Sequence, residues 1–271
     1  MPLTKVLITV KTYPAISTKY DELVCTAGFR EDGSWVRIYP IQFRQRPYHE
    51  QYSKYEWIEL DLVKNTSDPR PESYRPVSHS HSINVLGKIP ADGNAWMDRR
   101  EIVLKKVYSN LRQLIGESKN RDLCTSLAVF KPTKIIDFFW KEVEREWPKE
   151  KLVQFQQLNL FQSTTSKKPE VVRKLPYKFS FMFEDDQGVR STMMIEDWET
   201  GELFWNCLRG NGGDEAKACA DVRKKYFDDF AKTKDLYFFL GTTLANHFVG
   251  KNPFIIIGTF HPKPITQLNL F

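Results

Sequence analysis

The chain has 271 residues, of which 41% are hydrophobic and 27% charged, a composition typical of a globular protein with one large or two ordinary domains. No apolar run approaches the ~20 residues that a membrane-spanning helix needs, and the N-terminus lacks the basic patch and apolar run of a secretion signal. The four cysteines, Cys25, Cys124, Cys207 and Cys219, form no Cys-x-x-Cys pair, which argues against a disulfide framework and against a zinc ribbon. We therefore expect a reduced, cytoplasmic protein with no membrane partner.

The net charge of +6 is unevenly distributed along the chain. Residues 1–150 carry 24 Lys and Arg against 20 Asp and Glu, residues 151–178 carry 6 against 1, and residues 179–271 carry 10 against 13. This distribution indicates that a polyanion, if one binds, contacts the first two parts. Ordinary solvated lysines explain the same excess, because it is small in the first part.

The first half is predicted to be rich in strands. β-branched and aromatic residues between turn signals predict strands at 4–11, 22–30, 34–41, 55–64 and 83–89. Asp32-Gly33 predicts a hairpin turn, because both residue types tolerate a positive φ. Further along, apolar spacing predicts a helix over 98–118, two strands within 126–140 and a charged helix near 141–156.

The polar segment 162–169 predicts a linker. Beyond it we expect a hairpin of strands at 177–183 and 190–195, helices near 202–208 and 214–232, and strands at 235–241 and 252–260. Asp214 is predicted to be the N-cap of the second helix. The uniformly apolar stretch from Phe254 to Ile257 predicts a central strand covered on both faces.

Many short consecutive strands with a few inserted helices favour an α+β, β-rich fold over a doubly wound sheet. We expect small OB-like barrels in two domains joined by a basic linker. The expected divisions are an OB-like domain at 1–150, a helix end and linker at 151–176, a smaller α+β or OB-like domain at 177–261, and an extended tail at 262–271.

A pentapeptide occurs twice in the sequence. Residues Gln157, Leu158, Asn159, Leu160 and Phe161 recur in the same order at the C-terminus as Gln267, Leu268, Asn269, Leu270 and Phe271. The first copy adjoins the linker, and the second follows two prolines that should hold the tail extended. Both positions suit a peptide that binds a partner.

Both copies resemble the Gln-Leu-x-Leu-Phe motif by which bacterial polymerases, mismatch-repair proteins and other DNA-processing factors bind the β sliding clamp. The resemblance covers 10 of 271 residues. It implies that the glutamine amide hydrogen-bonds at the rim of the clamp cleft while the leucines and phenylalanine enter apolar pockets. The alternative is that these apolar side chains end an amphipathic helix and pack on the first domain.

A second candidate site lies in the stretch from Trp35 to Arg46. Strand alternation sends Val36 and Ile38 to one face, and Trp35, Arg37 and Tyr39 to the other. Aromatic rings beside a guanidinium are suited to stacking on bases and neutralising phosphates, and Arg44 and Arg46 extend that surface. The alternative is a large aromatic core with arginines at its rim.

Over its full length the sequence resembles an uncharacterised group of bacterial dual OB-domain proteins. The resemblance rests on four stretches: 25–29 (CTAGF), 35–40 (WVRIYP), 70–76 (RPESYRP) and 194–198 (MIEDW). It implies small nucleic-acid-binding barrels, in agreement with the strand pattern.

Signals for catalysis are weak. Residues that could begin a magnesium nuclease site are Glu59 and Asp61 on one strand, and Asp98, Glu101 and Lys105 on the predicted helix. Both sets are also typical of ordinary charged surfaces. His79 and His81 have no further metal ligands nearby in the sequence. We therefore assign no catalytic residue, metal or cofactor and favour a protein that is not an enzyme.

The leading hypothesis is an accessory factor of bacterial DNA replication, repair or mobile-element defence. It would bind single-stranded or double-stranded nucleic acid through Trp35, Arg37, Tyr39, Arg44 and Arg46, and the sliding clamp through the pentapeptides. One alternative is a clamp-tethered, metal-dependent nuclease. Another is an interaction adaptor that binds no nucleic acid.

Overall fold

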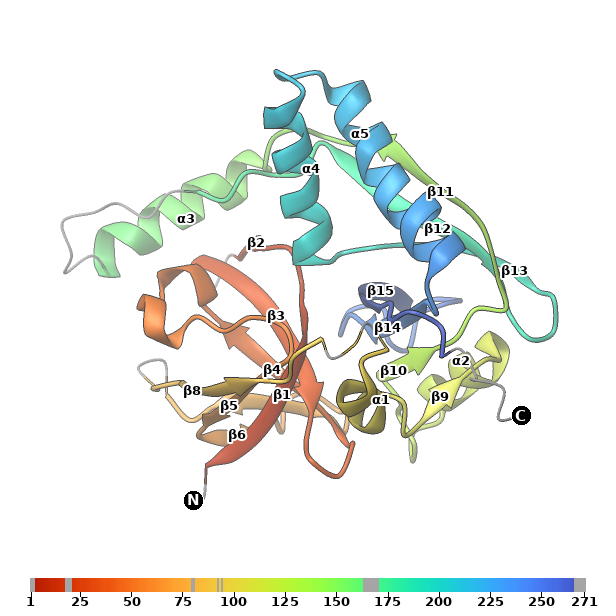
Figure 1. Ribbon diagram of the computed structural model, residues 1–271. Helices are drawn as coiled ribbons and strands as arrows, with labels where there is room; N and C mark the ends of the chain where they lie inside the picture. The colour runs from red at the N-terminus through yellow and green to blue at the C-terminus, as the bar shows by residue number, and fades with distance from the viewer. Residues whose placement is uncertain are drawn as a thin grey trace.

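The computed structural model describes residues 3–17, 21–78, 81–91, 93, 95–162 and 171–265 (Figure 1). These residues form an α+β, strand-rich fold with three sheets, as the sequence predicted. Within them, no helix combines the length and the hydropathy needed to cross a bilayer.

The first sheet is formed by the amino-terminal strands and curls on itself (Figure 1). Its order is β6-β7-β4-β3-β1-β5-β8, with β2 pairing β3. The strands are β1 (Thr4–Lys11), β2 (Ala15–Ser17), β3 (Asp21–Phe29), β4 (Trp35–Ile41), β5 (Glu56–Leu60), β6 (Leu62–Lys64), β7 (Ser73–Pro76) and β8 (Asn84–Lys88). Alternating residues such as Val6, Ile8, Val36 and Ile38 fill its concave side.

The second sheet has the order β15-β14-β10-β9, and the third β11-β12-β13. Their strands are β9 (Val107–Tyr108), β10 (Leu127–Phe130), β11 (Lys134–Glu142), β12 (Tyr177–Glu184), β13 (Arg190–Met194), β14 (Tyr237–Thr242) and β15 (Phe254–Phe260). Because β10 pairs with β14, residues 127–130 share a sheet with residues 237–260. The pairing therefore spans the division that the sequence suggested near residue 150.

The helices are α1 (Met97–Val103), α2 (Leu111–Lys119), α3 (Lys149–Gln162), α4 (Trp198–Gly210) and α5 (Glu215–Arg223), and α5 continues as a π-helical segment over Lys224–Ala231. Helices α4 and α5 cover the third sheet (Figure 1). Between them and the sheet lies an aromatic core that includes Phe138, Phe181, Phe204 and Tyr226. The Asp214 side chain caps α5 by accepting from the Lys217 amide, as predicted.

Two predictions at the level of single elements are wrong. The helix expected over 98–118 is split into α1 and α2, because Val107 and Tyr108 pair with β10 and the Asn110 side chain caps a new helix. The apolar strand β15 lies at the edge of its sheet instead of at the centre. Its side chains are nevertheless almost all buried, and at its outer edge the Glu196 amide donates to the Ile256 carbonyl, 2.8 Å away.

A third core joins the first sheet to the second. Val10 and Phe29 of the first sheet pack with Val129, Phe239 and Phe260 of the second. The rings of Phe29 and Phe239 meet at 6.3 Å. Each buried side chain of this size contributes about 1.5–3 kcal/mol, so this apolar contact stabilises the packing of the two sheets.

Gly28 offers a test of the close approach between β1 and β3. A Cβ atom at this position would lie 2.0 Å from the Leu7 carbonyl oxygen, which is backbone and cannot swing away. We expect Gly28→Ala to lower the free energy of unfolding by about 2 kcal/mol or more, measured by urea denaturation. The matched control is Gly116→Ala in α2, where a Cβ meets nothing within 4 Å; it should raise stability by up to about 1 kcal/mol. Equal effects of the two variants would contradict the close approach.

Candidate functional site

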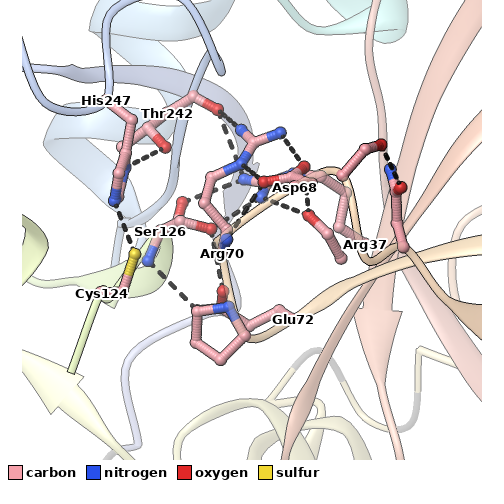
Figure 2. Close-up of polar contacts among 12 residues, drawn as sticks. Arg37, Asp68, Arg70, Glu72, Cys124, Ser126, Thr242 and His247 are labelled. Carbon is pink, nitrogen blue, oxygen red and sulfur yellow. Dashed lines mark hydrogen bonds and ion pairs between the residues drawn. The ribbon is translucent and has the colours of Figure 1, made fainter. Parts of the chain in front are cut away.

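Two buried arginines bridge the first and second sheets (Figure 2). Arg37 of β4 is only 3% exposed. Its guanidinium donates to the Ser126 hydroxyl at 2.7 Å and to the Ser126 carbonyl at 3.1 Å, just before β10. Arg70 donates to the Thr242 carbonyl at the end of β14, at 2.6 Å. Arg37 thus lies in the first sheet and Arg70 in the loop between β6 and β7, while the acceptors lie beside β10 and at the end of β14 in the second sheet.

Two carboxylates complete this junction. Asp68 accepts two hydrogen bonds from Arg70, at 2.8 and 2.6 Å, and one from the Ser73 hydroxyl at 2.7 Å. Although burial opposes ionisation, these hydrogen bonds lower the pKa of Asp68 to about 2. Glu72 accepts from the Ser126 amide at 3.1 Å and from its hydroxyl at 2.9 Å. Asp68 and Arg70 therefore form a buried ion pair, while Arg37 and Glu72 are satisfied by hydrogen bonds to neutral groups such as Ser126.

A cysteine and a histidine lie beside the arginines. The Cys124 sulfur is 3.2 Å from Nε2 of His247, whose Nδ1 is 2.9 Å from the Thr242 hydroxyl (Figure 2). Burial raises the pKa of Cys124 and lowers the pKa of His247. A neutral thiol beside a neutral imidazole is the opposite of the ion pair that activates a nucleophilic cysteine. The pair is therefore suited to holding structure.

A groove runs along α4, facing Tyr13, Pro14 and Arg44 at one end and the segments 145–152 and 171–176 along the rest. Two adjoining cavities, of about 170 and 460 Å³, share Val171, Val172, Arg173 and Trp205 in their walls. Aromatic and basic side chains line them: Tyr13, Arg44, Arg145, Trp147, Lys174, Trp198 and Arg209. We call this the tryptophan groove.

Hydrogen bonds hold the walls of the tryptophan groove in register. The Trp205 indole donates to the Tyr13 hydroxyl at 2.8 Å, and that hydroxyl donates to the Arg173 carbonyl at 2.8 Å. The Trp147 indole donates to the Val172 carbonyl at 2.8 Å. Gly201 of α4 lets the Tyr13 ring pack against the helix, because a Cβ atom at this position would lie 2.1 Å from that ring. Three segments far apart in the sequence are thereby fixed around one opening.

The charged groups of the tryptophan groove are mostly positive and exposed. The Arg173 guanidinium lies 3.9 Å from the centre of the Trp205 ring, and Arg44 and Arg209 are exposed at the rim. The acidic residues in the walls are Glu146, Glu202 and Glu215, and Glu215 is paired with Arg145 at 2.7 Å. Partly exposed rings such as Trp147 and Trp198, beside exposed guanidinium groups, can bind bases and phosphates together.

The predicted nucleic-acid residues do not form one surface. Trp35 packs on Phe29, with ring centres 3.9 Å apart, and meets the Phe239 ring at 5.8 Å. Arg37 is the buried bridge described above, and Tyr39 is 40% exposed.

Arg44 lines the tryptophan groove. Arg46 pairs with Glu50 at 3.0 Å and lines a separate cavity of about 190 Å³ with His81. The sequence reasoning missed Trp147, Arg173, Trp205 and Arg209. Its one available signal was the basic connector that contains Arg173.

The first pentapeptide, residues 157–161, lies within helix α3. Its side chains, and the whole second copy at 267–271, are outside the described residues. In the part of the chain that the structure describes, no group of three or more His, Cys, Asp and Glu could hold a metal ion.

Comparisons with known proteins divide the chain at the same place as the sheets. Residues 2–105 match the family described as "Domain of unknown function (DUF8758)", and residues 108–271 match "Domain of unknown function (DUF8757)". A solved structure described as "Structure of murine DNA binding protein bound with ds DNA" aligns over 98% of this chain and 97% of that chain, with a TM-score of 0.33 and 10% identity. A likeness of that degree carries no argument about function. No curated protein matches the chain.

The arginine junction predicts a large effect on stability. Arg70→Met should lower the free energy of unfolding by about 3–5 kcal/mol, because it leaves the Asp68 carboxylate buried without its partner. The control is Arg190→Met, which removes an exposed pair with Glu184 at 3.1 Å and should cost less than about 1 kcal/mol. Thermal and urea unfolding of both variants measure the difference. A loss for Arg70→Met as small as the control's would show that the junction contributes little.

Proposed function

The chain belongs to the DUF8757 family, and we propose that it is a nucleic-acid-binding accessory factor without catalytic activity. One observation supports this above the others: the tryptophan groove places the partly exposed rings of Trp147 and Trp198 beside exposed arginines. Base stacking on an aromatic ring contributes about 1–3 kcal/mol per base and tolerates any sequence. The function that the groove supports best is binding of single-stranded nucleic acid with little sequence preference.

The setting we propose is bacterial DNA replication, repair or mobile-element defence in the cytoplasm, with the β sliding clamp as the protein partner. The support is the repeated pentapeptide QLNLF, one copy of which ends the chain. In helix α3 the first copy has a helical backbone, so extended binding to a cleft would require the end of α3 to unwind. The terminal copy is therefore the first choice for the main clamp contact.

Basic residues of the tryptophan groove should determine nucleic-acid affinity. We expect Arg173→Ala, Lys174→Ala and Arg209→Ala each to weaken binding of a single-stranded oligonucleotide. Each lost phosphate contact should reduce the slope of log affinity against log salt by about 0.7. Fluorescence anisotropy at several salt concentrations measures both quantities.

The control for this series is Arg190→Ala, at the start of β13 and not part of the groove lining; it should leave affinity and slope unchanged. Equal losses in all four variants would indicate diffuse charge attraction instead of a groove. Cleavage of the oligonucleotide on addition of Mg²⁺ would favour the nuclease alternative, and absence of any binding would favour the adaptor.

The pentapeptides should determine clamp binding. We expect deletion of residues 267–271 to reduce binding sharply without changing the melting temperature, because two prolines separate them from β15. If both copies reach clefts of one clamp, Leu160→Ala with Phe161→Ala should also lower apparent affinity, by up to ~10².

Titration of a purified bacterial clamp tests this, with a shuffled tail of the same composition as the control. Wild-type protein that does not bind at tens of micromolar clamp would contradict the clamp proposal. A large fall in melting temperature for the Leu160 and Phe161 variant would mean that the first copy serves the fold.

A further inference from the structure

The loop between β14 and β15 exposes apolar side chains. Leu244, Phe248 and Val249 are 52%, 44% and 79% exposed, and Leu123 on the neighbouring loop is 52% exposed. We call these four residues the apolar tip. Single exposed apolar residues are common, but a cluster on adjoining loops usually marks a binding surface.

The apolar tip is held rigidly from below. His247, which lies between the exposed residues in the sequence, is fully buried and is fixed by contacts to the Thr242 hydroxyl and the Cys124 sulfur. The Phe248 ring stands edge-on against the His247 ring, with centres 4.6 Å apart at 77°. The contact to Cys124 also ties the loop that carries Leu123 to the loop that carries the other three.

Backbone hydrogen bonds tighten the loop itself. The Asn246 amide donates to the Thr243 carbonyl at 3.2 Å, and the Gly250 amide donates to the Asn246 carbonyl at 2.9 Å. The Thr242 carbonyl at the base of the loop accepts from Arg70 at 2.6 Å. The side chains of the tip are therefore presented by a backbone that has little freedom left to lose on binding.

The charges around the tip favour a polyanion. The two loops, residues 119–124 and 243–252, contain the basic residues Lys119, Arg121 and Lys251 and one acidic residue, Asp122. All four are exposed. An apolar protrusion with a basic surround matches proteins that insert apolar side chains between base steps while cations contact the flanking phosphates. A protein partner would gain from this positive charge only if its own surface were acidic, whereas every nucleic acid supplies phosphates.

We propose that the apolar tip is a wedge for duplex nucleic acid, in which Phe248 and Val249 insert between stacked base pairs while Arg121 and Lys251 contact the phosphates. This inference rests on the proposed nucleic-acid function and adds a second contact, distinct from the tryptophan groove. In this proposal the buried Cys124 and His247 pair has a structural role: it keeps the wedge rigid enough to separate stacked bases.

The experiment uses the full-length protein and a short DNA duplex that carries 2-aminopurine, whose fluorescence rises when its base is unstacked. Wild-type protein should raise the fluorescence on binding. Phe248→Ser with Val249→Ser should abolish the rise and weaken duplex affinity about tenfold, while affinity for a single strand stays unchanged. Val189→Ser, which alters a 44% exposed valine at the β12–β13 turn, is the control and should behave as the wild type.

Other outcomes separate the two proposals. If wild-type protein binds duplex without a rise in fluorescence, or if the Phe248 and Val249 variant keeps full duplex affinity, the wedge is overturned while the proposed function stands. If wild-type protein binds neither strand form, both fail. Sedimentation with anionic phospholipid vesicles provides the remaining arm: capture that depends on Phe248 and Val249 would assign the tip to a lipid surface and overturn the wedge.

Discussion

The bond from Arg70 to the Thr242 carbonyl is the contact on which the relation between the two sheets depends. The guanidinium is buried, and it donates to Asp68 on its own side while it reaches the last residue of β14. The Asp68 carboxylate is held in turn by the Ser73 hydroxyl. A buried cation is tolerated only when its hydrogen-bonding groups are satisfied. The second sheet must therefore lie where the Thr242 carbonyl can accept a hydrogen bond from Arg70. If one sheet slid against the other, the buried guanidinium would lose this acceptor and the fold would be destabilised.

The same requirement explains why Arg37 and Trp35 differ from their sequence-based assignment. Strand alternation correctly separates Val36 and Ile38 from Trp35 and Arg37, because that separation is a local property of the backbone. What covers each face is not local. The second sheet, formed from residues more than seventy positions away, covers the face that carries Trp35 and Arg37. Periodicity therefore predicted the faces, and only the tertiary fold could show that this face is mostly internal.

The tryptophan groove could not be predicted for a related reason. The residues that form its walls include Tyr13, Trp147, Arg173 and Trp205. These residues are too far apart in the sequence to form a recognisable motif. Most strands and the α5 cap follow directly from residue type and turn signals, but Trp147 and Arg173 lie outside helices and strands, and Trp147 was expected to be helical. The missing information was which turns of those elements meet, and that depends on contacts such as the Tyr13 ring over Gly201.

A second buried ion pair, between Lys54 and Asp197, positions the tryptophan groove. Its role parallels that of Arg70, which holds the base of the loop that carries the apolar tip. Lys54, just before β5, donates to the Asp197 carboxylate at 2.8 and 2.9 Å, and Asp197 is the residue that precedes α4. The Asp197 side chain accepts from Lys54 and makes no cap hydrogen bond to α4. Helix α4, with Trp198 and Trp205, is thereby oriented against the part of the chain that carries Arg44. In both places a buried charge fixes a surface that we propose binds nucleic acid, so ordering of that surface is completed on folding and does not have to be repeated at each binding event.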